Sequence, residues 1–479
     1  MSLQRAASPW LLISLMLGSA GCGSPADGGT TISQIDSTGL AKLLDSAMAA
    51  GMARESIPGA AFILIKDGRT ILAKGYGHAD AESRRPWSPE GTIFPVASIT
   101  KVFTATAVMQ LVDQGKIQLG TDVNQYLTSV KVPGTYPQPI TPAHLLSHTA
   151  GLDEIPGRQA SSPKDVIPLG RFLRNRLVRV HPPGEITSYS SYGAALAGLL
   201  VQDVSGLSFE DFLRRSIWQP LGMSRTSMKL PARGNSEFAT AYELDDGQLR
   251  PIPYESYHTP PTASVVSTLP DMARFMAAHL HNGRNGTKPI LSDSSAELMH
   301  RQYVTMHPKV PGWTLGFQVN DLNGRWILEH GGDIGGFSSN MTLLPDEGVG
   351  FLVVHHLEGG NLRFDIRRLI LDRYFPETRR LQLPIAQDTN PGRLRRFAGK
   401  YRPGIHCHSC SGEGPDLPVF EVTVNGDGSI SVWDERWFEV SPRYFVSANG
   451  RSRLGFAEDK RGKIFALTAG SWRVLERVH

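Results

Sequence analysis

A serine and a lysine stand three residues apart in Ser98-Ile99-Thr100-Lys101, at the head of an apolar-periodic stretch over residues 102–114. Residues at positions i and i+3 of a helix lie on the same face, so the hydroxyl and the amine are predicted to be neighbours. A serine hydroxyl is a weak nucleophile until a base takes its proton, and a partly desolvated lysine can be that base. The pair therefore indicates nucleophilic catalysis, although the same spacing also arises by chance in ordinary helices.

Two further segments carry groups that a nucleophilic serine would need. Residues 183–191 place Tyr189 in a turn before an alanine-rich helical stretch, where a tyrosine can equally serve packing or local hydrogen bonding. Residues 329–337 hold four glycines around a predicted strand. Glycine lets a substrate approach the backbone closely, and free strand N–H groups can bind an oxyanion. Taken alone, this second segment is only a turn-rich connection.

Histidines and cysteines occur at two places that raise the question of a metal. His144 and His148 have a weak metal-like i, i+4 spacing, and we interpret them as structural. Cys407 and Cys410 lie in a His-Cys-His-Ser-Cys run without a second ligand pair at a suitable spacing. We therefore expect a local disulfide or two free thiols there, and neither a metal nor a cofactor.

The elements that must position these residues alternate between strands and helices. Residues 60–66 and 70–76 are predicted strands joined by an Asp-Gly hairpin turn. A mostly helical middle follows, with helices predicted at 165–178, 192–204, 209–218 and 270–281. Strands return at 313–319, 325–329, 337–344 and 349–355. The pattern predicts one sheet built from both ends of this region, with helices inserted between them.

The chain changes character after a proline-containing stretch at residues 376–391. Beyond it, short strands separated by turns such as Asn449-Gly450 predict a small antiparallel β domain or barrel. We expect a first domain over residues 39–385 and a second over 386–479. The strands predicted in the second domain are 420–424, 430–433, 443–447, 454–458, 464–468 and 472–476.

The N-terminal residues have the features of a targeting segment. Arg5 precedes an apolar core at residues 10–17 and a small-residue site at 18–21, and Cys22 follows at the position of a lipidated cysteine. We expect a signal peptide with a probable lipobox over 1–22, and a flexible tether over 23–38. We then expect an exported cell-envelope lipoprotein, held at the membrane only by its lipid, with ordinary signal-peptide cleavage as the alternative. Ser19 stands where a lipobox usually has leucine.

Composition and charge are those of a globular protein that can bury a large core. The 479 residues are 40% hydrophobic and 20% charged, with a net charge of +4. The basic residues are scattered, apart from a short run of Arg393, Arg395 and Arg396 that we interpret as solvated surface. The charge therefore gives no case for a nucleic-acid partner. The expected partner is a small-molecule or peptide substrate, and the oligomeric state is left open.

Ordered blocks between residues 57 and 357 resemble one protein family. They include Gly75-Tyr76-Gly77, residues 94–101, 144–152, Pro220-Leu221-Gly222-Met223, residues 267–275 and the His330 segment. The chain resembles the serine β-lactamase and penicillin-binding-protein superfamily, specifically its class C β-lactamase-like hydrolases, which include β-lactamases, D-amino-acid peptidases and carboxylesterases. The resemblance implies an α+β fold, with an antiparallel sheet flanked by a helical subdomain. The C-terminal domain is similar to a lipocalin-like appendage of such hydrolases.

The resemblance also implies a role for each residue. Ser98 is the acylated nucleophile and Lys101 its proton-accepting partner, and Tyr189 acts as a base that later relays a proton to the leaving group. A tyrosine has an ordinary pKa of about 10, so we expect charged Lys101 to lower it. Backbone N–H groups of Ser98 and Asp333 are expected to form the oxyanion hole. Substrate contacts are expected from Ser191, His330, Gly331 and Gly332.

Two of these positions depart from the family pattern. Ser191 stands where an asparagine is usual, and a single hydroxyl replaces a carboxamide. His330 stands where β-lactamases have a lysine, so a substrate carboxylate is attracted less near neutral pH unless the imidazole is protonated. We therefore expect an esterase or D-amino-acid peptidase (D,D-carboxypeptidase-like), ahead of a class C-type β-lactamase. A non-catalytic receptor for cell-wall fragments is the further alternative.

Overall fold

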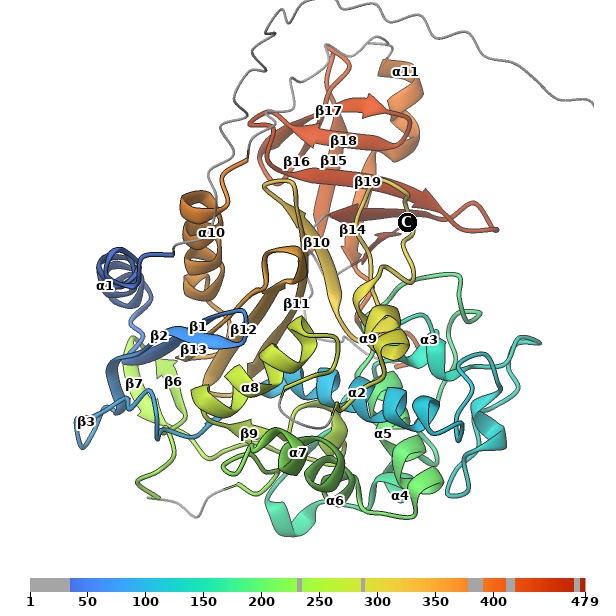
Figure 1. Cartoon of the computed structure of the whole chain (residues 1–479). Coiled ribbons are helices and arrows are strands. Elements are labelled where there is room, and N and C mark those ends of the chain that lie inside the picture. The colour runs from blue at the N-terminus through green and yellow to red at the C-terminus, as the bar shows by residue number, and fades with distance from the viewer. Residues whose placement is uncertain are drawn as a thin grey trace, which may run out of the picture. The chain divides into compact units, whose positions relative to one another are not determined.

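The computed structural model describes residues 35–230, 235–285, 289–377, 391–410, 418–468 and 474–478. Within them a helix-flanked sheet and a closed β-barrel are formed (Figure 1). The predicted signal peptide, Cys22 and most of the tether lie outside the described residues, as do residues 378–390 around the predicted domain boundary. The first described helix begins at Ser37 and includes the last two residues of the predicted tether. Among the described residues, no helix is long and apolar enough to cross a membrane.

The large sheet has seven strands in the order β10-β11-β12-β13-β1-β2-β3, and every pairing is antiparallel. The two ends of the region meet where β1 pairs with β13, with Ala60 opposite His355. This confirms the prediction of a sheet built from both ends. The strands are β1 (Gly59–Lys66), β2 (Arg69–Asp80), β3 (Arg85–Pro86), β10 (Gln318–Leu322), β11 (Arg325–Ile334), β12 (Phe337–Leu344) and β13 (Val349–His356).

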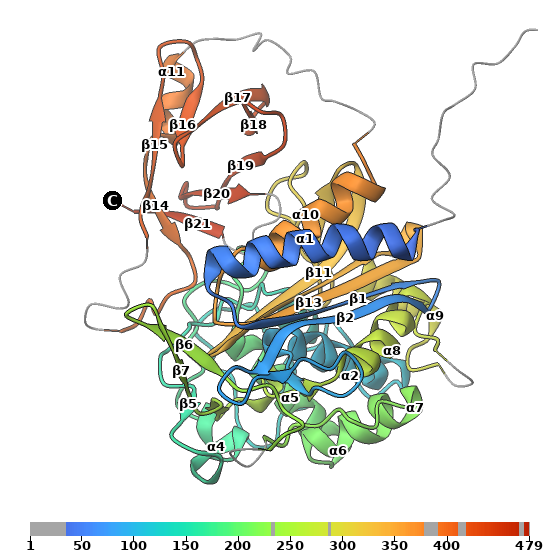
Figure 2. The ribbon, with the colours of Figure 1, turned by 90° about the vertical axis from the view of Figure 1, so that its left-hand side faces the viewer.

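Both faces of this sheet are covered, so its central strands are buried along their whole length, including the polar residues of β12. Every residue of β12 and β13 is buried. Figure 2 shows α1 (Ser37–Glu55) and α10 (Leu362–Tyr374) over one face, with α2 (Thr100–Asp113) and α8 (Leu269–Leu280) beneath the other. The remaining helices are α3 (Pro142–Leu146), α4 (Leu169–Leu173), α5 (Ser191–Ser205), α6 (Phe209–Leu213), α7 (Gln219–Leu221), α9 (Asp293–His300) and α11 (Pro391–Leu394).

Helix α2 lies inside the first of the two predicted domains, which we call the hydrolase-like region. Its residues from Thr100 to Leu111 are all buried, and it is one of the elements of the main apolar cluster. Packing on every side fixes the helix, and therefore fixes the direction of any side chain in its first turn. Helix α5 also contacts it, and α5 begins with a side-chain cap from Ser190 to the Gly193 N–H.

Three of the predicted elements were wrong in extent or type. The helix predicted at 165–178 is reduced to α4, because Pro168 stands directly before it and disfavours helical geometry in the preceding residue. The strand predicted at 313–319 begins only at Gln318, because Gly316 has a φ of 121° that interrupts the extended backbone. The second half of the helix predicted at 209–218 is a π-helical turn.

The C-terminal region forms a closed barrel of eight antiparallel strands. Its first and last strands join through the pairing of Lys400 with Val478, which leaves no free sheet edge. Tyr401, Phe445 and Phe456 belong to its apolar centre. Two strands, β14 and β17, were not predicted. The barrel strands are β14 (Gly399–Pro403), β15 (Phe420–Val424), β16 (Ile430–Val432), β17 (Glu435–Ser441), β18 (Tyr444–Ser447), β19 (Arg453–Glu458), β20 (Ile464–Thr468) and β21 (Val474–Val478).

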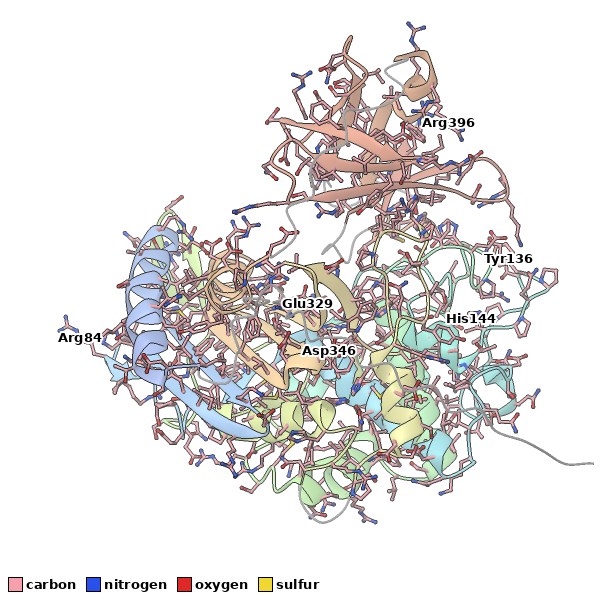
Figure 3. The ribbon with its side chains drawn as sticks, turned by 45° about the horizontal axis from the view of Figure 1, so that its top comes forward. Arg84, Tyr136, His144, Glu329, Asp346 and Arg396 are labelled. Carbon is pink, nitrogen blue, oxygen red and sulfur yellow. A yellow bond between two sulfur atoms is a disulfide. The ribbon has the colours of Figure 1, made fainter. Side chains whose placement is uncertain are left out.

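Short strands pair outside the two main sheets. They are β4 (Phe94–Pro95) with β9 (Val266–Ser267), β5 (Gln159–Ala160) with β8 (Ser256–Tyr257), and the hairpin β6 (Tyr242–Asp245) with β7 (Gln248–Pro251). Basic side chains are dispersed over the surface, as Arg84 and Arg396 illustrate in Figure 3. Arg396 pairs with Glu458, and Arg393 pairs with Glu439, so two arginines of the predicted basic run are ion-paired.

Candidate active site

Ser98 lies in a short 3-10 turn, Ala97–Ile99, directly before α2. The residues on either side of it are buried, while Ser98 itself is half-exposed. Ala97 has a φ of 51°, a left-handed conformation that costs free energy in any residue with a Cβ. The turn is held by the β4–β9 pairing just before it. A strained, anchored turn thus presents one hydroxyl to solvent, which is what an accessible nucleophile requires.

Lys101 reaches this hydroxyl from the first turn of α2, as the i, i+3 spacing predicted. Its Nζ donates to Ser98 Oγ at 3.1 Å and to the Thr262 carbonyl at 2.9 Å. The side chain is buried, and no carboxylate forms an ion pair with it among the described residues. Burial, reinforced by the charge of Arg158, holds the pKa of Lys101 well below its usual value. An amine with a depressed pKa loses its proton more easily, and at 3.1 Å from the hydroxyl it is placed to accept the serine proton.

Tyr189 joins the same group from the turn before α5. Its ring lies 4.9 Å from Lys101 Nζ, and its hydroxyl hydrogen-bonds with Ser98. The expected lowering of its pKa by a charged Lys101 was wrong. Burial of the phenol raises the pKa of Tyr189 above its ordinary value, and Ser98 and Arg158 offset this only in part. Burial also depresses the pKa of Lys101, so the protonated amine that would stabilise a phenolate is itself disfavoured.

Aromatic rings form the wall behind Tyr189. The His148 ring lies 4.6 Å from the Tyr189 ring, and Trp313 lies 4.4 Å from His148. The His148 Nδ1 accepts the Ser190 N–H at 3.1 Å, and burial keeps its pKa well below the ordinary value. His148 therefore holds the backbone next to Tyr189 as a neutral ring. It is structural, as expected, but in contact with the site.

His330 faces Tyr189 from β11, with the ring centres 6.0 Å apart. Its Nδ1 donates to the Gly331 carbonyl at 2.7 Å, and burial lowers its pKa to about 3. The imidazole is thus neutral at physiological pH. Its Nε2 is buried without a hydrogen-bond partner among the described residues. The group that replaces the usual lysine is therefore an uncharged acceptor.

Gly332 brings the β11 strand against the turn that carries Ser98. A Cβ at this position would lie 2.6 Å from the Val96 carbonyl oxygen, 2.7 Å from Ser339 Oγ and 2.9 Å from the Ala97 Cβ. Real Cβ atoms do not approach other atoms so closely. Only glycine therefore allows the strand to lie this close to the nucleophile's turn.

Asp333 follows Gly332, and its carboxylate is turned into a salt bridge. Arg363, from α10, donates to Asp333 Oδ1 at 2.6 Å and to Oδ2 at 2.7 Å, and also to the Gly332 carbonyl at 2.9 Å. This bidentate pair fixes the strand end whose N–H is predicted to bind an oxyanion. That role of the Ser98 and Asp333 N–H groups stays a prediction.

Ser191 is the first residue of α5 and is buried. Its neighbour Ser190 donates to Glu154 Oε1 at 2.9 Å, and the Tyr192 N–H donates to the same oxygen at 3.2 Å. The structure therefore holds the start of α5, and with it Tyr189, through Glu154. A direct role for Ser191 in substrate binding stays a prediction.

Three residues near the site were not singled out in the sequence. Thr262 accepts from Lys101, Glu154 holds the turn of Tyr189, and Arg158 acts through its charge on Lys101 and Tyr189. Arg158 is partly exposed and forms no ion pair among the described residues, and it lies 5.9 Å above the Tyr257 ring. Glu154 and Arg158 come shortly after residues 144–152, and this nearness to a family-like block was the only sequence feature that could have pointed to them. Nothing in the sequence marked Thr262.

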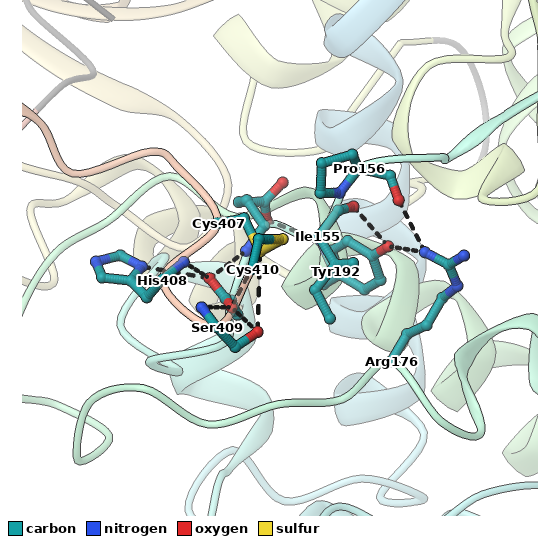
Figure 4. The surroundings of a disulfide bond; sticks show 10 residues. Ile155, Pro156, Arg176, Tyr192, Cys407, His408, Ser409 and Cys410 are labelled. Carbon is teal, nitrogen blue, oxygen red and sulfur yellow. Dashed lines mark hydrogen bonds and ion pairs between the residues drawn. A yellow bond between two sulfur atoms is a disulfide. The ribbon is translucent and has the colours of Figure 1, made fainter. Parts of the chain in front are cut away.

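The other histidine and the two cysteines have local structural roles. His144 Nδ1 accepts the Thr141 N–H at 3.2 Å in a capping box at the start of α3. Cys407 and Cys410 form a disulfide, one of the two alternatives expected for them. The residues between them, His408 and Ser409, hydrogen-bond to one carboxylate, that of Asp153 (Figure 4).

Comparison with known proteins gives the same family over most of the chain. The family model described as Beta-lactamase matches residues 44–374. Penicillin-binding protein 4 of Amycolatopsis lactamdurans is 31% identical over 313 residues, which are 61% of this chain and 79% of that protein. Protein flp of Staphylococcus aureus (strain N315) is 28% identical over 316 residues, 63% of this chain. That match spans 60% of the length of Protein flp.

Solved structures agree with the fold. The octameric penicillin-binding protein homologue from Pyrococcus abyssi has a TM-score of 0.62 at 25% identity, over 91% of this chain and 100% of that one. EstCE1, a hydrolase with promiscuous acyltransferase activity, has a TM-score of 0.59 at 23% identity, over 70% of this chain and 100% of that one. With the convergence of Ser98, Lys101 and Tyr189 and a matching family model over residues 44–374, the chain belongs to the beta-lactamase family.

Proposed function

We propose that this protein is a serine hydrolase that cleaves an ester or amide through an acyl-enzyme on Ser98. The observation that carries the proposal is the 3.1 Å contact between Lys101 Nζ and Ser98 Oγ, with burial depressing the pKa of the lysine. An amine with a depressed pKa, within hydrogen-bond reach of a partly exposed hydroxyl, is the arrangement needed to activate a nucleophile.

The proposed reaction has two halves. Ser98 Oγ forms a bond to the substrate carbonyl carbon while its proton moves to Lys101 Nζ. The N–H groups of Ser98 and Asp333 bind the oxyanion that develops, and the C–O or C–N bond then breaks. Tyr189 is protonated at rest and hydrogen-bonded to Ser98. It passes its proton to the leaving group and regains one from Lys101. Water then adds to the acyl-enzyme by the same route, and Ser98 is released with its proton.

We favour an ester or a D-amino-acid peptide as substrate over a β-lactam. A neutral His330 supplies no positive charge for the carboxylate that β-lactams carry, and its pKa of about 3 keeps it neutral at physiological pH. Ser191 offers a hydroxyl where a carboxamide is usual. Neither change affects acyl transfer itself. The relationship to a protein named as a penicillin-binding protein is consistent with acylation of Ser98 by an amide substrate.

A non-catalytic receptor of the same fold is the competing possibility. A protein that had lost catalysis would have no reason to keep a buried lysine against a serine, since burying an amine is costly. Lys101, Ser98 and Tyr189 are nevertheless together. Hydrolysis of a nitrophenyl ester distinguishes the two, because a receptor would bind ligands reversibly without turnover.

We also propose that the protein is exported and anchored through Cys22. The apolar core at residues 10–17 and the small residues before Cys22 support this, and so does the Cys407–Cys410 disulfide, because disulfides persist in oxidising compartments. Metabolic labelling with a fatty-acid analogue, compared between the natural chain and Cys22→Ala, is the test. Equal labelling of both would refute the anchor.

The central experiment is active-site labelling. The Ser98→Ala protein should lose all labelling by a fluorophosphonate probe, whereas undiminished labelling would rule out this nucleophile. Tyr189→Phe should slow an alkyl ester or a D-peptide more than a nitrophenyl ester, because a nitrophenolate leaves without needing a proton. A panel of short esters, D-amino-acid peptides and a chromogenic cephalosporin then ranks the substrate classes.

A further inference from the structure

Three potential metal ligands converge where the barrel contacts the hydrolase-like region. They are His181 from the connection between α4 and α5, His408 from the disulfide loop, and Glu476 from β21. One ligand atom from each lies within 4.8 Å of the other two. Glu476 Oε1 is 3.6 Å from His181 Nε2 and 3.3 Å from His408 Nε2. His181 and Glu476 are buried.

We propose that His181, His408 and Glu476 bind a zinc ion, with water in the fourth position. Zinc takes histidine nitrogen at about 2.0–2.1 Å and carboxylate oxygen at about 2.0–2.2 Å in tetrahedral geometry, and two histidines with one glutamate is a known donor set. Tetrahedral ligand atoms at such bond lengths are about 3.3 Å apart. The two distances to Glu476 Oε1 are close to that spacing, so small side-chain movements complete the site.

The surrounding contacts fit a metal ligand set. His408 Nδ1 hydrogen-bonds to Asp153 Oδ1 and its Nε2 to Glu476 Oε1, each at 3.3 Å, so a zinc ion would take the place of the Nε2 proton between the ring and Glu476. A carboxylate on the far nitrogen is the usual partner of a metal-bound histidine and fixes its tautomer. Lys463 donates to Glu476 Oε2 at 2.6 Å, so this oxygen is occupied while Oε1 points to the two imidazoles.

His181 gives an independent reason to infer a ligand. Its side chain is 94% buried, and neither ring nitrogen has a hydrogen-bond partner among the described residues. A buried polar group without a partner is costly, and an imidazole aimed at a carboxylate from 3.6 Å gains little from it. A zinc ion between the two satisfies His181 Nε2 directly.

The cysteines do not compete for this site. Cys407 and Cys410 are joined in a disulfide, so they present no thiolate to a metal. Of the His-Cys-His-Ser-Cys segment, only His408 belongs to the ligand cluster. The His408 N–H donates to Asp153, and the next residue, Glu154, accepts from Ser190 beside Tyr189. A zinc ion on His408 would therefore link the barrel to the turn that carries Tyr189. We assign it a positioning role in the proposed hydrolase.

The test is metal content, measured without reducing agent on the full chain after chelator treatment, reloading with zinc and desalting. We expect about one zinc per chain, and loss of that zinc in both His181→Ala and Glu476→Gln. Asp153→Asn, which removes the outer partner, should weaken zinc binding about 10- to 100-fold. The matched control is His406→Gln, which alters the neighbouring histidine outside the cluster and should keep the zinc. Cys407→Ser/Cys410→Ser should keep it as well.

Cobalt substitution provides a second readout, because tetrahedral cobalt has strong visible absorption bands that the two ligand variants should lose. Thermal unfolding of each variant reports folding, and Glu476→Gln preserves side-chain volume where His181→Ala does not. A zinc-free natural chain, or zinc retained equally by both ligand variants, would overturn the site. A zinc-loaded protein that hydrolyses no ester would keep the site and refute the proposed hydrolase, so the two failures are distinguishable.

Discussion

Adding one methyl group at Gly332 should separate the geometry of the active site from the stability of its sheet. A Cβ there would lie 2.6 Å from the Val96 carbonyl oxygen and 2.9 Å from the Ala97 Cβ. Ordinary carbon–oxygen contacts are about 3.3–3.6 Å, so strand and turn must separate by roughly 0.7–1 Å. A misplacement of about 1 Å near reacting atoms costs on the order of 100-fold in rate. We therefore expect Gly332→Ala to lower kcat/KM for a nitrophenyl ester about 100-fold.

The adjacent glycine is the matched control. A Cβ at Gly331 would meet Asn340 Oδ1 at 3.5 Å and the Ser339 carbonyl at 3.7 Å, which are ordinary contacts. Gly331→Ala should therefore leave the strand in place, so any loss of kcat/KM in it reports the predicted substrate contact and stays well below the loss in Gly332→Ala. Thermal unfolding of both variants checks that the sheet is intact. Full activity in Gly332→Ala, or equal losses in the two variants, would refute the claim that close approach of β11 to the Ser98 turn forms the site.

Three further predictions concern charge. Because burial depresses the pKa of Lys101, kcat/KM should rise with pH as the amine loses its proton and should level off well below pH 10.5, whereas Lys101→Arg, which cannot lose its proton, should be inactive at every pH. Arg158→Gln removes a cation that helps depress this pKa, so the pH profile should move to higher pH, while Arg158→Lys should leave it in place. An unmoved profile in Arg158→Gln would contradict that electrostatic coupling. Burial lowers the pKa of three histidines: to about 3 for His330, about 4 for His355 and about 3 for His356. Below pH 6.5 the unfolded chain therefore binds more protons than the folded chain. The stability that is fully present above pH 6.5 is lost as the pH falls. At pH 5 each histidine lowers the free energy of unfolding by up to about 2 kcal/mol relative to neutral pH. A melting temperature unchanged between pH 7 and pH 5 would be inconsistent with neutral buried imidazoles.

Local patterns predicted the framework of the molecule well. The strands predicted at residues 337–344 and 349–355 match β12 and β13 almost to the residue, and the i, i+3 spacing predicted the contact of Lys101 with Ser98. Helix 165–178 failed because periodicity alone did not weigh Pro168. Thr262 and the trio of His181, His408 and Glu476 were invisible, because their partners are 68 or more residues away and only the tertiary fold brings them together.

The electrostatics of the site show why residue types alone did not fix the mechanism. The sequence suggested a charged lysine lowering the pKa of a tyrosine, which is sound for two groups in a polar setting. Here the same enclosed space surrounds both groups, and burial disfavours the charged form of each, so the amine loses its proton more easily and the phenol less easily. In the proposed mechanism Lys101 is therefore the proton acceptor for Ser98, and Tyr189 is a proton donor. On this proposal Lys101 becomes positively charged when it takes the proton of Ser98, and that charge then favours the transfer of the Tyr189 proton to the leaving group.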